Sequence, residues 1–145
     1  MKKKTIDHVL RHTWQSVSKM YNEEAAKYNG TMAVGFALLS IDPKKGTPST
    51  SLGPKMGMEA TSLSRTLKSM EEKNLIFRKQ HPIDGRSVLI HLTDLGKTHR
   101  ASSKQAVMKF NDKVINEIGE KSLDNFHFVI EKINQIIDDK NIFIK

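Results

Sequence analysis

The sequence predicts a mostly helical, α+β fold in which helices flank one short β-hairpin. Apolar residues recur every three or four positions over most of the 145 residues, which is typical of amphipathic helices. Only residues 75–79 and 87–92 are strand-like, and the turn-forming segment 81–86 separates them. Cysteine is absent, so neither a disulfide framework nor a thiolate metal site is expected.

The N-terminal arm is expected to be one long helix. Its apolar positions are Ile6, Leu10, Trp14, Val17, Tyr21, Ala25 and Tyr28. Asn29 and Gly30 should end it, since both tolerate the left-handed conformation of a helix C-cap. Thr31 can then cap a second helix that runs to about Ile41, and the composition of residues 42–48 predicts a loop.

Two short helices with a tight turn at Gly57 and Met58 are expected next. The second runs from about Ala60 to Lys73, and Asn74 is its expected left-handed stop. Its inner stripe is Leu63, Leu67 and Met70. Pro54 falls within the first of the two helices, and the sequence leaves open whether that helix starts late or is kinked.

After the hairpin, Thr93 is expected to cap a long helix with a break near Gly119. The final helix then carries a broad apolar stripe, formed by Leu123, Phe126, Val129, Ile130, Ile133, Ile136 and Ile137. A face this wide must be covered. The two terminal arms could pack on each other within one chain, but a dimer would bury them more completely.

The positive charge is concentrated in the middle of the chain. Lys and Arg number 24 against 16 Asp and Glu, a formal net charge of +8, and residues 43–104 hold twelve basic and five acidic residues. Such a local excess attracts polyanions, of which nucleic acid is the commonest, although a solvated lysine-rich surface would show it too. No apolar run approaches the ~18 residues that span a bilayer. We therefore expect a cytoplasmic protein with no membrane partner.

The predicted order of helix, turn, helix, strand, basic hairpin and strand is that of a winged helix-turn-helix, a fold suited to double-stranded DNA. The second helix of such a unit enters the major groove. No Asp or Glu occurs between Ala60 and Met70. Hydroxyls can contact bases or phosphates, and an Arg can bind guanine through two hydrogen bonds. The candidate DNA-binding residues on this helix are Thr61, Ser62, Ser64, Arg65 and Lys68.

The hairpin adds a second set of candidate DNA contacts, Arg78, Lys79, Asp84 and Arg86. An Arg at such a tip can enter the narrow, negative minor groove. Asp84 would accept a hydrogen bond from Arg86 and hold its guanidinium in the inserting rotamer. The alternative is a solvent-exposed turn with an incidental ion pair, which would contribute little.

These segments resemble the MarR family of bacterial transcriptional regulators. The similarity lies in the helix TSLSRTLKSMEEKNLI (61–76), the wing PIDGRS (82–87) and the following LTDLGK (92–97). It covers about residues 48–100, and the flanking helices agree in pattern. Two departures are Gly85, where the family more often has Arg, and Asn74, where it usually has Gly.

The resemblance implies a homodimer built from residues 1–30 and 105–145, with residues 31–104 as the winged helix-turn-helix domain. Two such domains would read a pseudo-palindromic operator, with Arg65 and its neighbours in the major groove and Arg86 in the minor groove. The implied function is transcriptional repression at promoter DNA. The resemblance also implies a small-molecule effector bound between this domain and the dimerisation region.

Other functions find less support in the sequence. There is no phosphate-binding loop, no G-x-S-x-G elbow and no H-E-x-x-H, so we expect neither an enzyme nor a cofactor. His8 and His12 lie four residues apart and could place two imidazoles on a metal, but isolated helical histidines are far commoner than such sites. The alternative function is a winged-helix protein-interaction module that does not bind DNA.

A ligand pocket could form where the first helices meet the winged domain. The candidate lining residues are Trp14, Tyr21, Tyr28, Met32, Phe36 and Met108. The same aromatic and methionine side chains at helical spacing could equally be plain core.

Overall fold

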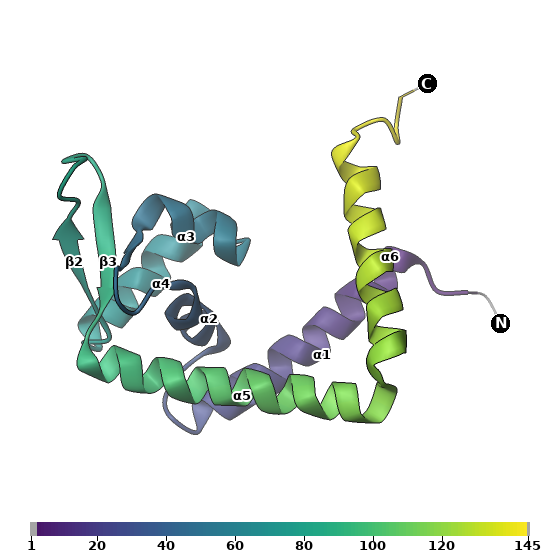
Figure 1. Ribbon diagram of the computed structural model, residues 1–145, viewed down its shortest axis with the longest axis horizontal. Helices are drawn as coiled ribbons and strands as arrows, with labels where there is room; N and C mark the ends of the chain where they lie inside the picture. Colours follow the sequence, from purple (N-terminus) through teal and green to yellow (C-terminus); the bar gives the residue numbers. More distant parts are fainter. Residues whose placement is uncertain (1–2, 145) are drawn as a thin grey trace. The chain divides into compact units, whose positions relative to one another are not determined.

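The computed structural model describes residues 3–144 as two compact units, residues 1–106 and 107–145. In the first unit, α1 (Ile6–Ala26) and α2 (Met32–Ser40) precede β1 (Thr47–Pro48), α3 (Ser49–Met56) and α4 (Ala60–Glu72). The strands β2 (Ile76–Gln80) and β3 (Val88–Leu92) follow, and α5 (Asp94–Ile118) starts directly after β3 (Figure 1). The prediction of a mostly helical winged helix-turn-helix is confirmed.

The first two helices begin and end where the sequence predicts caps. The Thr5 hydroxyl accepts a hydrogen bond from the His8 backbone N–H at 3.4 Å, and Thr31 does the same for Val34 at 3.2 Å. Asn29, just after α1, has a φ of 58°, the left-handed conformation that an asparagine tolerates.

The sheet contains one strand that the sequence analysis missed. Among the described residues the strand order is β1-β3-β2, with both pairs antiparallel. Thr47 and Pro48, expected to be loop, pair with Ile90 and Leu89. The buried Thr47 hydroxyl also accepts a hydrogen bond from the Asp42 N–H at 2.9 Å, so this short strand closes the preceding loop onto the sheet.

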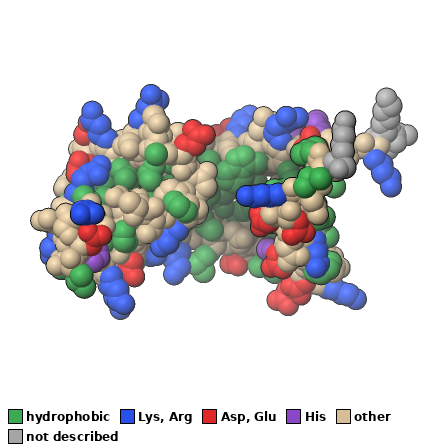
Figure 2. Space-filling view, turned by 90° about the horizontal axis from the view of Figure 1, so that it is seen from above, with side chains coloured by type: hydrophobic (Ala, Val, Ile, Leu, Met, Phe, Trp, Pro, Cys, Tyr) green, Lys and Arg blue, Asp and Glu red, His purple; other side chains and the backbone are tan. Residues whose placement is uncertain are grey.

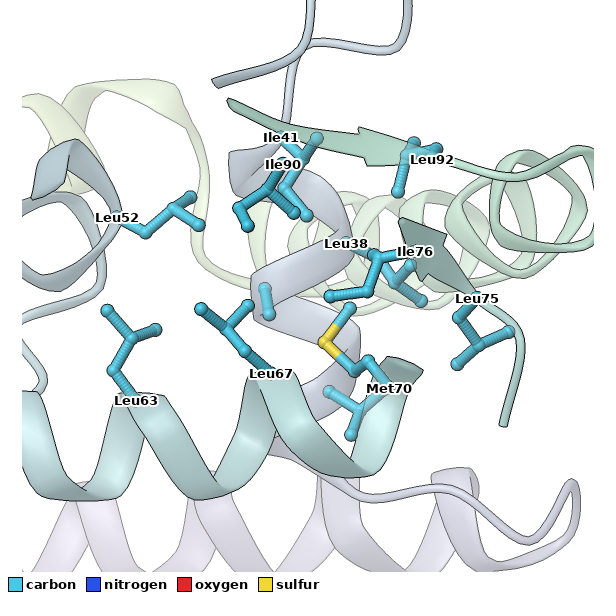
Figure 3. Close-up of a cluster of buried hydrophobic side chains, with 12 residues drawn as sticks. Leu38, Ile41, Leu52, Leu63, Leu67, Met70, Leu75, Ile76, Ile90 and Leu92 are labelled. Carbon is cyan, nitrogen blue, oxygen red and sulfur yellow. The ribbon is translucent and has the colours of Figure 1, made fainter. Parts of the chain in front are cut away.

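One apolar core holds the winged unit together. Leu63, Leu67 and Met70 of α4 are all buried, as predicted, and Figure 3 shows them rising from α4 toward side chains of the other elements. The remaining core residues are Val34, Ala37, Leu38, Ile41, Leu52, Leu75, Ile76, Ile90 and Leu92. Because α4 anchors its inner face here, its opposite face is presented in a fixed orientation.

The question that Pro54 raises is answered by the length of its helix. Helix α3 starts at Ser49 and Pro54 lies in its last turn, where few hydrogen bonds remain to be lost. Gly57 then adopts a left-handed φ of 60° and ends the helix. A hydrogen bond from the Met58 N–H to the Gly53 carbonyl, 3.0 Å long, closes the tight turn that leads into α4.

Taken by itself, the second unit contains the end of α5 and α6 (Glu120–Asp138), with Gly119 between them at a φ of 93°. Several large apolar side chains of α6 are about half exposed, namely Phe126, Phe128, Val129, Ile136 and Ile137. Over the described part of the chain, no helix combines the length and apolar character needed to cross a bilayer.

Candidate nucleic-acid interface

Helix α4 presents polar residues on the face opposite its buried stripe. Thr61, Ser62, Ser64, Arg65 and Lys68 are all exposed, as a DNA-reading face requires. The acidic residues of the helix, Glu71 and Glu72, lie only at its C-terminal end. Its N-terminal two-thirds therefore offers hydroxyl and cationic groups without a neighbouring carboxylate. In Figure 2, Lys and Arg side chains project around the end of the molecule that carries β2 and β3 in Figure 1.

The wing is the hairpin formed by β2, residues 81–87 and β3. Its strands pair from Ile76 with Leu92 to Gln80 with Val88. Beyond the last pair, the His81 N–H donates to the Ser87 carbonyl at 3.0 Å, and the Ser87 N–H donates to the Asp84 carbonyl at 3.1 Å. The Gln80 side-chain amide donates to the Gly85 carbonyl at 3.2 Å. The backbone of the tip is thus held by its own polar groups.

Asp84 organises the tip differently from the prediction. Its Oδ1 accepts a hydrogen bond from the Arg86 backbone N–H at 3.0 Å, and its Oδ2 accepts one from the Ser87 hydroxyl at 3.0 Å. The expectation that it would hold the Arg86 guanidinium is wrong, because a carboxylate two residues before Arg86 reaches the backbone more easily than the end of the long side chain. These two bonds, the Arg86 N–H first, lower the pKa of the Asp84 carboxyl.

The two cations of β2 occupy different environments. The Arg78 Nε lies 3.3 Å from the Glu71 Oε2, so an ion pair joins β2 to the end of α4. Lys79 is the next residue along the strand and therefore points to the opposite face, as does His91 of β3 relative to Ile90. Arg78 and Lys79 are both exposed, but they do not form one cluster.

Arg86 lies at the end of the tip, exposed, with its backbone fixed by Asp84. All nine predicted DNA-binding residues are exposed, on α4, on β2 and at the wing tip. The structure adds two polar residues to the wing that were not among those nine, His81 and Ser87. The signal for His81 was its place before a proline at the end of a strand, which marks a turn but not a hydrogen-bond acceptor.

Comparison with known proteins bears on this arrangement. Residues 31–88, which include α2, β1, α3, α4 and β2, match the model of the MarR family. The chain belongs to the MarR family. A curated relative of this MarR protein is the HTH-type transcriptional regulator SarZ of Staphylococcus epidermidis. The two are 22% identical over 130 residues, which are 90% of this chain and 80% of SarZ.

Two solved structures show the same fold as this MarR chain. The MepR–DNA complex of S. aureus gives a TM-score of 0.83 at 16% identity, covering 92% of this chain and 98% of MepR. The PcaV regulator of Streptomyces coelicolor, in complex with its natural ligand, gives 0.77 at 16% identity, covering 93% and 98%.

The candidate ligand-binding residues of this MarR chain are spread over both units. Tyr21 of α1 contacts Phe36 of α2 edge-on, with ring centroids 5.7 Å apart, and partial burial raises the pKa of Tyr21. Asn22 accepts a hydrogen bond from the Met32 N–H at 2.9 Å. Trp14 and Tyr28 are more than half exposed, as is Met108, which belongs to the second unit.

The paired histidines of α1 stack on each other. The His8 and His12 rings are nearly parallel, with centroids 6.1 Å apart. Within residues 3–144, no group of three or more His, Cys, Asp or Glu side chains is placed to hold a metal ion.

Proposed function

We propose that this chain is a sequence-specific, double-stranded DNA-binding regulator of transcription and not an enzyme. The observation that carries the proposal is the exposed, acid-free part of α4 beside a wing whose tip presents Arg86. The MepR–DNA complex, which shares the fold, and the regulator SarZ support it. A regulator of bacterial promoters acts where the DNA is, so we place the protein in the cytoplasm.

In the proposed complex, α4 enters the major groove and the wing reaches the adjacent minor groove. Thr61, Ser62 and Ser64 near the start of α4 contact base edges or phosphates, and Arg65 reads a guanine. Lys68, Arg78 and Lys79 neutralise phosphates, which sets the salt dependence of binding. Arg86 inserts into the minor groove, where the negative potential is strongest.

The active form is proposed to be a homodimer on a pseudo-palindromic operator. Residues 1–30 and 105–145 form the dimerisation region, and residues 31–104 form the DNA-binding domain. Two recognition helices in successive major grooves then lie about 34 Å apart, one turn of duplex. The half-exposed apolar side chains of α6 support this assignment, because water is a poor environment for so many.

Repression and its release by a small ligand complete the proposal. A ligand that binds better to a form with a different spacing of the two winged domains would lower operator affinity. The ligand-bound PcaV structure, which has the same fold, supports an effector. The edge-on contact of Tyr21 with Phe36 supports a pocket beside these residues of α1 and α2.

The direct test is fluorescence anisotropy of labelled duplexes with the purified chain at several salt concentrations. Random duplex should bind with an affinity that falls as salt rises, with a log–log slope of about −0.9 for each neutralised phosphate. Selection from randomised duplex should yield a two-fold-related site that binds more tightly. A chain that ignores duplex DNA in dilute buffer would instead be an interaction module.

Arg65→Ala is expected to relax discrimination at one base pair of the selected site by about 1–3 kcal/mol while changing binding to random duplex less. Lys104→Ala removes an exposed cation of α5 and serves as the matched control. An equal loss on selected and random duplex for Arg65→Ala would contradict its base-reading role.

Arg86→Ala is expected to weaken binding to all duplexes, because the minor-groove contact depends on groove width and charge more than on base identity. The salt slope of the variant should fall in magnitude by about one phosphate equivalent. If binding to random duplex keeps its affinity and slope, Arg86 does not enter the groove.

A further inference from the structure

We propose that His81 is a positioning residue of the wing, whose neutral imidazole holds the tip backbone in the shape that presents Arg86 to DNA. The inference rests on the proposed DNA-binding function and adds a regulation to it: binding weakens as His81 gains a proton.

The geometry centres on one ring nitrogen. His81 Nδ1 accepts hydrogen bonds from the backbone N–H groups of Ile83 and Asp84, both at 3.1 Å. The His81 N–H also donates to the Ser87 carbonyl on the other side of the tip. Ile83 is 91% exposed, so its side chain does not anchor the tip by burial. Polar contacts therefore hold this part of the wing.

A nitrogen that accepts two N–H groups carries no proton of its own. In the neutral imidazole this places the proton on Nε2, whereas both nitrogens are donors in the charged form. Protonation at Nδ1 therefore turns an acceptor into a donor that faces two other donors. The Ile83 and Asp84 amides lose their shared partner, and histidine is the side chain whose charge ordinarily changes between pH 5 and 8.

The charged groups around His81 act on this equilibrium in both directions. The Asp84 carboxylate favours the imidazolium, while Lys79, two residues back on β2, and Arg86 across the tip oppose it. Asp84 keeps its own hydrogen bonds through this range, because its pKa is lowered from 3.8. A carboxyl with a lowered pKa stabilises the folded tip above its unfolded value and loses that effect only as pH falls through the folded one. The two acid-sensitive contacts of the tip therefore separate by pH.

The sign of the pH effect distinguishes positioning from simple electrostatics. If His81 only added charge to the interface, its protonation would strengthen attraction to phosphate and binding would rise as pH falls. If it positions the tip, protonation frees the backbone beside Arg86 and binding falls. Two net hydrogen bonds make a loss of about tenfold reasonable.

The experiment compares wild type with His81→Asn and His81→Ala in duplex binding between about pH 8 and pH 5. The asparagine oxygen can accept from backbone N–H groups two residues on, as in an Asx-turn, and does not titrate. Wild type should lose about tenfold. His81→Asn should bind like wild type at pH 8 with a flatter profile, and His81→Ala should bind weakly throughout. His99→Gln, on α5, should keep the wild-type profile.

A DNA-free measurement separates this inference from the proposed function. Backbone ¹⁵N relaxation of Ile83 and Asp84 should show the wild-type tip becoming mobile as pH falls through the same range, and the His81→Ala tip mobile at every pH. A chain that binds no duplex at pH 8 would refute the DNA-binding function while this readout still reported on the tip. Binding that rises with acid, a His81→Asn profile equal to wild type, or a tip of constant mobility would overturn the positioning role.

Discussion

Single side chains in this protein fix backbone segments more than they fix one another. Asp84 and His81 both reach main-chain N–H groups of the wing, and Asp42 does the same in the loop before β1, where it accepts from Lys44 and Lys45 at 2.8 and 2.9 Å. These bonds, the one from Lys45 first, lower the pKa of the Asp42 carboxyl. Short polar side chains suit this task because they reach the backbone two or three residues ahead.

Gly96 carries the clearest single-residue constraint on stability. The first turn of α5 packs so closely on the chain after α4 that a Cβ at Gly96 would overlap the Leu75 carbonyl oxygen. Because backbone must move to relieve the overlap, Gly96→Ala should lower the free energy of unfolding by about 3 kcal/mol, at the upper end for overpacking.

Gly35→Ala is the matched control, since a Cβ there would meet only the Ser103 hydroxyl at 3.3 Å, and a side chain can rotate away. Urea denaturation followed by circular dichroism measures both variants. Equal midpoints for the two would mean that α5 does not need its close contact with Leu75.

At the scale of elements, hydrogen bonds from loops decide where helices start. Thr93 joins three segments: its hydroxyl donates to the Asn74 carbonyl at 2.7 Å and accepts from the Gly96 N–H at 2.9 Å, and its own N–H donates to the Leu75 carbonyl at 3.0 Å. It thus ties the beginning of α5 to the turn that ends α4. The orientation of the proposed recognition helix depends in part on this residue.

Thr93→Ala should destabilise the winged unit by about 1–2 kcal/mol, because it removes a helix cap and leaves the Asn74 carbonyl without its hydroxyl partner. Thr93→Ser keeps the hydroxyl and should recover most of the loss. Thr98→Ala removes a hydroxyl that donates only to the Asp94 carbonyl of its own helix, so it should change the thermal midpoint little. A Thr93→Ala midpoint no lower than that of Thr98→Ala would contradict the capping role.

The elements differ in how far the sequence could predict them. The buried stripe of α4 and the left-handed Asn74, with a φ of 59°, follow from local pattern and local residue preference. The strand β1 does not, because two residues carry no periodicity and their pairing depends on β3, some forty positions later. The Arg78–Glu71 ion pair and the acceptor role of His81 depend likewise on hairpin geometry that sequence spacing leaves undetermined.

For the whole molecule, the arrangement of charge and apolar surface supports a division of labour between segments. The basic excess lies in residues 43–104, which include α3, α4 and the wing. The large exposed apolar side chains gather instead near the two ends of the chain, including Trp14 of α1 and Phe126 of α6. A DNA-binding middle with self-associating ends accounts for both, and the second half of that statement is open to a direct test.

Introducing carboxylates into the apolar stripe of α6 should break the proposed dimer. Val129 and Ile137 are 49% and 56% exposed and lie on one side of the helix, so Val129→Glu with Ile137→Glu adds two charges that a dimer would have to bury. Sedimentation equilibrium should give the mass of one chain for this variant and of two chains for wild type. Duplexes with two half-sites should bind it more weakly, because the half-sites are no longer engaged by linked domains.

The matched control places two carboxylates on the polar side of the same helix, with Lys121→Glu and Gln135→Glu. It should remain a dimer, and circular dichroism should show both variants equally helical, so that a loss of association cannot be traced to a loss of structure. Two variants that stay dimeric, or a wild-type chain that sediments as a monomer, would show that the α6 stripe does not form the interface and that the operator is not read by paired domains built from it.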